Sequence, residues 1–272
     1  MSGRIDQILA VCGLTFTEAV RQKFFYIVVL IGSGMLLGSG YFQQFDFGVD
    51  ELKFVIDFSF GTLFFLGSIL VITAGTQLFY SEIENRTAHT LLAKPIRHFD
   101  FLLGKLCGVQ LLMLLFVMVL CGLMTGLLYV RVQALPFVEG DALVRYGELW
   151  LYGFLQWARF GVLCAVCLLV GSFARSYLYA MMVSFFFMLV GQLQYIAQES
   201  YREITFLPLR WVVQALAWVF PNLQVFNVGD QLGHMEAGGL PLFVVLQLLL
   251  YAAAYILVYL WLAWWNFKRR EL

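Results

Sequence analysis

Six long runs of apolar residues, separated by shorter charged segments, dominate the hydrophobic pattern of this chain. Each run is close to the roughly 20 residues that an α-helix needs to cross a hydrocarbon core of about 30 Å. The predicted spans cover, in order, 24–42, 58–79, 106–130, 149–172, 178–197 and 241–265. The pattern therefore predicts an all-α polytopic membrane protein with six transmembrane helices.

Residues 1–23 show a different pattern, in which apolar positions recur at intervals of three and four. They run from Ile5 to Val20, with charged residues such as Arg4 and Glu18 between them. This is typical of an amphipathic helix in the membrane interface; a poorly ordered terminus is the alternative. We therefore divide the chain into an interfacial helix, 1–23, and a transmembrane domain, 24–272.

The outer segment 198–240, between the fifth and sixth runs, contains one further apolar stretch, Thr205–Phe220. This stretch is short and includes a proline and an arginine. We expect it to form an interfacial or re-entrant helix anchored by Trp211 and Trp218. A seventh span is the alternative, but it would move the basic C-terminal residues to the other side of the membrane.

The distribution of basic residues predicts the orientation. With the N-terminus inside, the inner segments hold 11 Lys and Arg residues against 6 Asp and Glu, and the outer segments hold 5 against 11. Because the cytoplasmic loops of membrane proteins carry the excess of basic residues, we expect both termini in the cytoplasm. The net charge of zero gives no reason to expect nucleic-acid binding.

Composition agrees with a membrane location, since 62% of the residues are hydrophobic and only 12% are charged. Soluble domains are about 25% charged. The five cysteines fall in or beside apolar runs, and they predict no disulfide framework. Cys164 and Cys167 share one helix face in the fourth run. We favour apolar packing for this pair over a redox or soft-metal role.

Catalytic motifs are missing from the sequence. It contains no G-x-x-x-x-G-K-[ST] loop, no G-x-S-x-G elbow and no H-E-x-x-H pair. His89, His98 and His234 all fall in or beside predicted loops, which argues against an axial haem ligand in mid-membrane. We therefore expect that the chain is not an enzyme by itself and binds no metal or cofactor of its own.

A few polar side chains fall within the predicted spans. Arg159 lies in the fourth run, where a charge costs about 2.5–3.5 kcal/mol by insertion scales and so requires a partner or a wet cavity. The partners expected for it are neutral: Gln156, Gln192, Gln194 and Gln77. Thr73, Thr76 and Gln77 form a polar stripe on the second span, which suits either helix packing or a transport pathway.

These observations give a candidate translocation path. Its members are Thr73, Thr76, Gln77, Arg159 and Gln192. A purely structural, hydrogen-bonded Arg159 is the equal alternative.

The charged loop 80–105, between the second and third spans, holds four basic residues and two histidines. Ser81 and Glu84 fit a capping box, which predicts a short helix that starts just after Ser81 and stops before Pro95. Asp100 suits the first turn of the next helix. The loop has too few apolar residues to bury itself, so we expect it to dock into a groove on a soluble partner. A solvated loop is the alternative.

Three clusters in this loop resemble the segment after the second span of type-2 ABC transporter permeases, whose ATPase is often a separate polypeptide. The clusters are Glu82-x-Glu84-x-Arg86-Thr87, Leu91-Leu92-Ala93-Lys94-Pro95 and Phe101-Leu102-Leu103-Gly104-Lys105. The amphipathic N-terminus, the six spans, the short SFARS turn, the stretch Pro221–Asp230 and the basic end agree with this resemblance. It covers essentially the whole chain.

The resemblance implies a type-2 ABC exporter transmembrane-domain fold, with an N-terminal elbow helix and a coupling helix that receives the motion of the ATPase. It assigns this coupling role to Glu82, Glu84, Arg86, Thr87, Leu91, Leu92, Lys94 and Pro95. The turn Ser172–Ser176, with Arg175, is implied as a second, smaller contact. Arg86 stands where the family often has Gly.

The resemblance also implies partners and a location. We expect two copies of an ABC ATPase subunit that hold the ATP and Mg²⁺, a second permease copy or a paralogue, and the inner membrane of a bacterium. Export is expected rather than import. The alternatives are a mechanotransmitter, which passes ATPase work to a periplasmic or membrane accessory protein, and a membrane scaffold without an ATPase.

Overall fold

The computed structural model describes residues 2–39, 51–84, 98–134, 146–200, 211, 219–228 and 240–269. Within these ranges the regular elements are helices, and no strand occurs. They are α1 (Ser2–Arg21), α2 (Lys23–Gly38), α3 (Glu51–Glu84), α5 (His98–Ala134), α6 (Tyr146–Phe173), α7 (Tyr177–Ser200), the 3₁₀ helix η3 (Leu223–Phe226) and α10 (Leu242–Arg269). The prediction of an all-α fold is confirmed.

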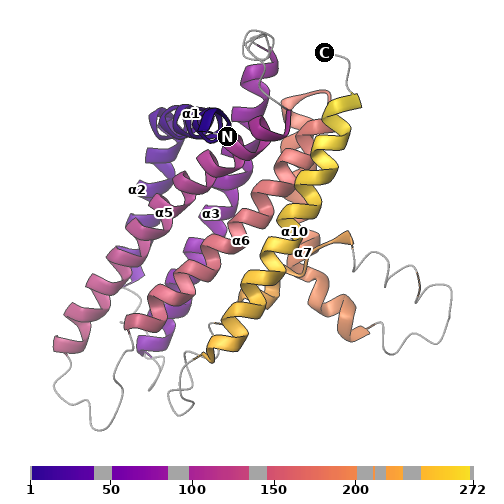
Figure 1. Cartoon of the computed structure of the whole chain (residues 1–272). Coiled ribbons are helices and arrows are strands. Elements are labelled where there is room, and N and C mark those ends of the chain that lie inside the picture. The colour runs from indigo at the N-terminus through magenta and orange to yellow at the C-terminus, as the bar shows by residue number, and fades with distance from the viewer. Residues whose placement is uncertain are drawn as a thin grey trace.

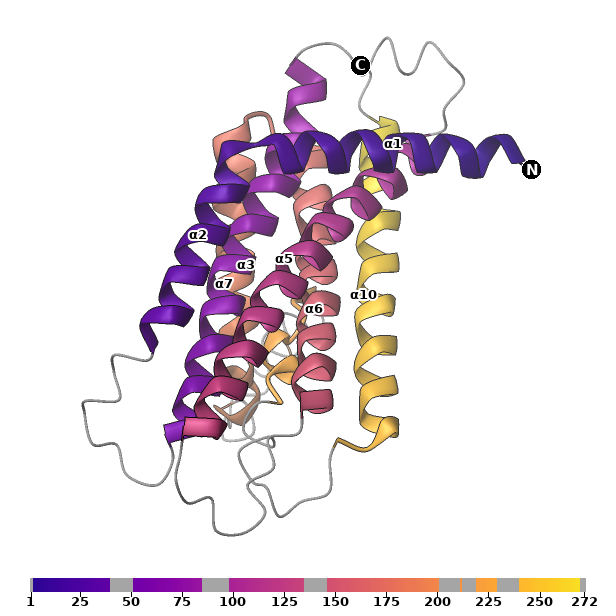
Figure 2. The same ribbon diagram turned by 90° about the vertical axis from the view of Figure 1, so that its left-hand side faces the viewer.

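The long helices form an elongated bundle, and α1 lies across one end of it (Figures 1 and 2). Five helices, α3, α5, α6, α7 and α10, are each long and apolar enough to cross a membrane. Helix α2 has 16 residues and reaches such a length only together with α1, from which it is bent by 62°. The bend falls at Gln22, whose backbone is extended. Residues 40–42 of the predicted first span lie outside the described residues.

The helix ends identify the two ends of the bundle. The Phe99 ring at the start of α5 packs against Trp264 near the end of α10, with 6.4 Å between ring centroids. Lys105, also near the start of α5, donates to the carbonyl of Leu78 near the end of α3. These termini therefore share the end that α1 crosses (Figure 2), which we call the α1 end. The opposite end is called the far end.

The predicted start of a new helix just after Ser81 is wrong. Helix α3 runs without interruption from Glu51 to Glu84, so Ser81 lies inside its last turns. Neither Gly nor Pro occurs between Phe79 and Glu84, and nothing local stops a helix that already has a formed turn to extend. The start of α5 agrees with prediction, because it begins at His98 and has Asp100 in its first turn.

Helix α6 is central and packs against α3, α5, α7, η3 and α10. Its contact with α3 depends on glycines, because a Cβ at any of three positions would press on or overlap a side chain of the other helix. The pairs are Gly67 with Phe160, Gly75 with Cys167, and Gly171 with Phe79. Small residues let helix backbones approach closely within a membrane. We call this contact, in the α1-side half of the two helices, the glycine seam.

Part of the outer segment 198–240 enters the bundle. The carbonyl of Val219 accepts a hydrogen bond from Tyr259, which lies 17 residues (242 to 259), or roughly 25 Å, from the start of α10. Asn227 accepts one from Tyr152, only six residues (146 to 152), or about 9 Å, from the start of α6. Residues 219–228 therefore run from deep in the bundle towards the far end. We call them the re-entrant limb.

The limb shares only Val219 and Phe220 with the stretch predicted as an interfacial or re-entrant helix, so that prediction falls almost wholly outside the described residues. Most of the predicted helix Thr205–Phe220, including Trp218, lies outside the described residues, and Trp211 is exposed. The buried positions of the limb are Pro221, Asn222, Leu223, Phe226 and Val228. The described limb therefore begins deep along the bundle axis and ends towards the side where α10 starts.

Candidate functional site

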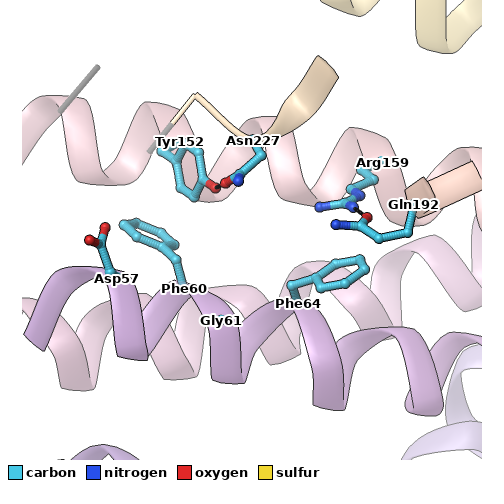
Figure 3. A pocket seen from close by; sticks show the side chains of 8 residues that line it. All are labelled: Asp57, Phe60, Gly61, Phe64, Tyr152, Arg159, Gln192 and Asn227. Atoms are coloured by element: carbon cyan, nitrogen blue, oxygen red, sulfur yellow. Dashed lines mark hydrogen bonds between the residues drawn. The ribbon is translucent and has the colours of Figure 1, made fainter. Parts of the chain in front are cut away.

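A pocket of about 360 Å³ lies between α3 and α6, on the far side of the glycine seam (Figure 3). Helix α3 contributes one face, with residues at spacings of three and four, and α6 contributes two residues seven apart. Helix α7 and the re-entrant limb complete the wall. The lining residues are Asp57, Phe60, Gly61, Phe64, Tyr152, Arg159, Gln192 and Asn227. The pocket thus combines aromatic walls with a few polar groups, as small-molecule sites do.

Arg159 forms the end of the pocket nearest the seam. It lies midway along α6 and is only 2% exposed. Its guanidinium donates to Gln156 Oε1 at 3.3 Å and to Gln192 Oε1 on α7. It also lies over the ring of Phe64 on α3, 3.7 Å from the centroid. Two predicted neutral partners of Arg159, Gln156 and Gln192, are thereby confirmed.

The two glutamines connect Arg159 to the re-entrant limb. Gln192 Nε2 donates to Gln224 Oε1, and Gln156 Nε2 donates to the carbonyl of Phe226 at 3.3 Å. Each amide therefore accepts from the guanidinium and donates to the limb. Each buried amide thus has a partner for its oxygen and a partner for its nitrogen, as buried polar groups require where water is absent. Through them, Arg159 fixes the position of the limb relative to α6 and α7.

Tyrosine side chains on α10 and α6 also hold the limb. On α10, the hydroxyl of Tyr251 accepts from the backbone N–H of Asn222 at 2.8 Å, and that of Tyr259 donates to Val219 O at 2.6 Å. On α6, Tyr152 donates to Asn227 Oδ1 at 2.7 Å. The limb contains little regular structure, so these side chains satisfy backbone and amide groups that would otherwise be unpaired in the membrane.

The polar stripe predicted on α3 lies outside the pocket. Thr76 is fully buried, but its hydroxyl donates to the carbonyl of Ile72, one turn earlier in the same helix, at 2.6 Å. Gln77 is exposed and Thr73 is half-buried. None of the three lines the pocket. Of the candidate path, the structure brings only Arg159 and Gln192 together.

Two of the coupling residues predicted in the loop lie at the α1 end. Glu82 and Glu84 occupy the last turn of α3. The other residues predicted in that loop, Arg86, Thr87, Leu91, Leu92, Lys94 and Pro95, lie outside the described residues. Because α3 ends and α5 begins at the α1 end, the loop that joins them emerges there.

The second predicted contact is a tight turn between α6 and α7. Arg175 is exposed in this turn. On either side of it, Ser172 donates to the Leu169 carbonyl at 2.6 Å, and Ser176 accepts from the N–H of Tyr179 at 3.3 Å, which caps the start of α7. The turn thus presents one cation from a locally fixed backbone.

Lys105, near the start of α5, links α5 to α3, and this role was not predicted from the sequence. Lys105 is 1% exposed, and its Nζ donates to the Leu78 carbonyl at 2.9 Å. The Phe101 ring lies 5.8 Å away. A hydrogen bond from a buried ammonium to a carbonyl is stronger than one between neutral groups. Lys105 therefore fixes the separation of the two helices from which the loop emerges.

Substitution of Lys105 by Met should lower the free energy of unfolding by about 1.5–3 kcal/mol, the usual contribution of a hydrogen bond to a charged group. Chemical denaturation in detergent micelles would measure the loss. Lys268→Met is the matched control, because Lys268 is exposed at the same end of the bundle and should tolerate the change. Equal stability of the two variants would contradict the role of Lys105.

The Cys164–Cys167 pair belongs to the packing of α6. Both side chains are fully buried, and Cys167 lies against Gly75 in the glycine seam. Among the described residues, no group of three or more His, Cys, Asp or Glu side chains is placed to hold a metal ion. The burial of both side chains and the contact of Cys167 with Gly75 agree with a packing role for the pair.

Comparison with known proteins agrees with the helical architecture. Residues 8–272 match the family model described as "ABC-2 family transporter protein". No curated protein matches the chain significantly. The matched region starts within α1 and includes every later helix, the pocket and the loop between α3 and α5. The chain is therefore a membrane subunit of the type-2 ABC transporter permease family.

Proposed function

We propose that this chain is the permease of an ATP-driven exporter, and that a separate ATPase acts on the ends of α3 and α6. One observation carries the proposal. The loop after α3 and the turn after α6 are the two segments to which the family resemblance assigns ATPase contact, and α3 and α6 are the helices that enclose the pocket. A force applied at either segment reaches the pocket along a single rigid helix.

The glycine seam suggests how such a force changes access. The seam keeps α3 and α6 in contact between the pocket and the α1 end, where the basic residues of the chain predict the cytoplasm. Separation of the helix ends would open the seam and connect the pocket to that side. Closure of the ATPase on ATP would restore it, so that the pocket communicates with one side at a time.

Two permease copies and two ATPase subunits complete the proposed transporter, with both termini of each permease in the cytoplasm of a bacterium. The long exposed apolar faces of α7 and α10 leave room for lipid or a second copy. ATP and Mg²⁺ belong to the ATPase in this scheme. A buried cation in a pocket between α3 and α6 favours translocation over the mechanotransmitter alternative.

Reversal of charge in the loop tests the proposal. In the double variant Glu84→Lys/Arg86→Glu, the amount of ATPase that co-purifies with the permease should fall at least about tenfold, a loss of about 1.4 kcal/mol or more. The reason is that like charges would then face the docking groove. Lys53→Glu, at the far end of α3, is the control and should leave binding unchanged.

The scaffold alternative makes a different prediction for the same samples. A scaffold without an ATPase would show no nucleotide-hydrolysing partner in the wild-type preparation. If an ATPase co-purifies equally with the double variant and with wild type, coupling through this loop is contradicted.

A further inference from the structure

Arg159 is a buried cation without a counter-charge. Within the described part of the chain, its polar contacts are the neutral amides of Gln156 and Gln192 and the ring of Phe64, and no carboxylate pairs with it. Its Nε is buried and lacks a hydrogen-bond partner. Charged groups inside membrane proteins are normally paired or face a functional cavity. The guanidinium of Arg159 faces a cavity, because it lines the pocket (Figure 3).

The walls beyond Arg159 are apolar and aromatic. Phe64 covers one face of the guanidinium, and Phe60 packs edge-on against Tyr152 with 4.1 Å between ring centroids. Aromatic surfaces of this kind bind apolar or aromatic groups. A ligand whose charged group lies at Arg159 would therefore place its apolar body between α3 and α6.

The far side of the pocket limits the charge of that ligand. Asp57 lines the pocket seven residues before Phe64 on the same helix, about 10 Å along its axis. Arg159 is the one basic residue among the described residues that line the pocket, so a second anionic group would have no cationic partner there. The pocket volume, about 360 Å³, is at the small end of the range for small-molecule sites. A compact molecule with one anionic group fits both limits.

We propose that the pocket binds an amphipathic monoanion whose carboxylate or phosphate group lies on Arg159 and whose apolar body packs on Phe60, Phe64 and Tyr152. The planar guanidinium offers oxyanions paired donors, because Nη1 and Nη2 each donate one N–H to a glutamine and retain a second. This inference rests on the proposed function, since it names the class of molecule that the permease would carry.

Calorimetric titration of the permease alone, in phosphatidylcholine nanodiscs, tests the proposal. The probes are 4-phenylbutyrate and methyl phenyl phosphate, a phosphodiester with one negative charge, compared with 4-phenylbutanol and 4-phenylbutylamine. The two anions should bind, and the alcohol and the amine should bind at least about tenfold more weakly, because hydrogen bonds to charged groups contribute that much or more. Empty nanodiscs provide the blank for partition into lipid.

Two variants address the site itself. Arg159→Gln should weaken binding of both anions at least about tenfold. Gly61→Leu blocks the pocket without altering Arg159, and nothing lies within 4 Å of the position its Cβ would occupy, so the fold should tolerate it. Gly122→Leu, at another open glycine outside the pocket, is the control and should bind as wild type does.

The results separate this inference from the proposed function. Equal affinity for the anions and the alcohol, or unchanged binding in Gly61→Leu, would overturn the monoanion site. Because the titration uses no ATPase, neither result depends on coupling through the loop. Co-purification of the ATPase with Gly61→Leu reports on that coupling independently.

The anion could come from a lipid headgroup or from a free amphiphile, and lipid composition distinguishes these sources. If the site accepts headgroups, 4-phenylbutyrate should bind wild type more weakly in nanodiscs with phosphatidylglycerol than in phosphatidylcholine nanodiscs. The Gly122→Leu control should show the same loss of affinity as wild type. If it accepts free amphiphiles only, the affinity should be the same in both lipids. Either result supports binding of an oxyanion at Arg159. If 4-phenylbutyrate binds in neither lipid, the proposed site is overturned.

Discussion

Oxidation of a Gly75→Cys variant should join α3 to α6 through the native Cys167 and stop ATP-driven turnover of the assembled transporter. A Cβ built at Gly75 lies 3.1 Å from the Cβ of Cys167, close to the roughly 3.5–4.5 Å of disulfide-bonded pairs. A covalent bond across the glycine seam would leave only the closed seam populated. ATP hydrolysis should therefore fall at least about tenfold, as expected when one of two required states is removed.

Reduction provides the internal control for this experiment. Dithiothreitol should restore hydrolysis in the same sample, and mass spectrometry should find the introduced cysteine linked to Cys167 only before reduction. The remaining cysteines, Cys12, Cys107, Cys121 and Cys164, would be replaced by Ala. Gly61→Cys, which has nothing within 4 Å of its Cβ position, should form no such bond. Full hydrolysis by the oxidised, cross-linked protein would contradict movement at the seam.

Substitution of Gly108 by Leu should detach α1 from the bundle. A Cβ at Gly108 would lie 2.6 Å from Thr15 Cβ and 2.9 Å from the carbonyl oxygen of Cys12. Neither atom is the flexible end of a long side chain, so the helices themselves must separate. Overpacking of this kind costs about 1–3 kcal/mol. Hydrogen exchange of the α1 amides should accelerate, because the helix loses the packing that protects it.

Gly122→Leu on the same helix is the control for this prediction. Its Cβ would meet nothing within 4 Å, so α1 should exchange as it does in the wild-type protein. If exchange in α1 is unchanged by Gly108→Leu, the helix does not depend on contact with α5 for its position.

The hydrophobic pattern was sufficient to predict the helices, because each span is long and apolar. It also located Arg159 and two of its partners, since a charge within an apolar run requires polar neighbours and only a few were present. The unbroken end of α3 was missed for a local reason. Ser81 and Glu84 match a capping box, but the same residues are compatible with the interior of a helix that has already formed.

The re-entrant limb and the glycine seam were harder to predict because both depend on distant contacts. Asn222, Gln224 and Asn227 make the limb appear to be a polar loop, although α10 accepts the backbone N–H of Asn222 and side chains on α7 and α6 donate to Gln224 and Asn227. In the same way, the sequence does not mark Gly67 and Gly75 as contact residues, because that role depends on the helix that packs against them. Residue spacing identifies a helix face but not the residues it meets.

We have proposed that work from a separate ATPase enters this permease through the loop between α3 and α5. Photo-cross-linking of the assembled complex tests it most directly, with the photoreactive group at Leu91 and, as a control, at Val132 near the far end of α5. We expect Leu91 to cross-link to the nucleotide-binding subunit in a yield that changes with ATP, and Val132 to give no such cross-link. Cross-links from Leu91 to lipid alone, or to proteins on the opposite side of the membrane, would contradict it.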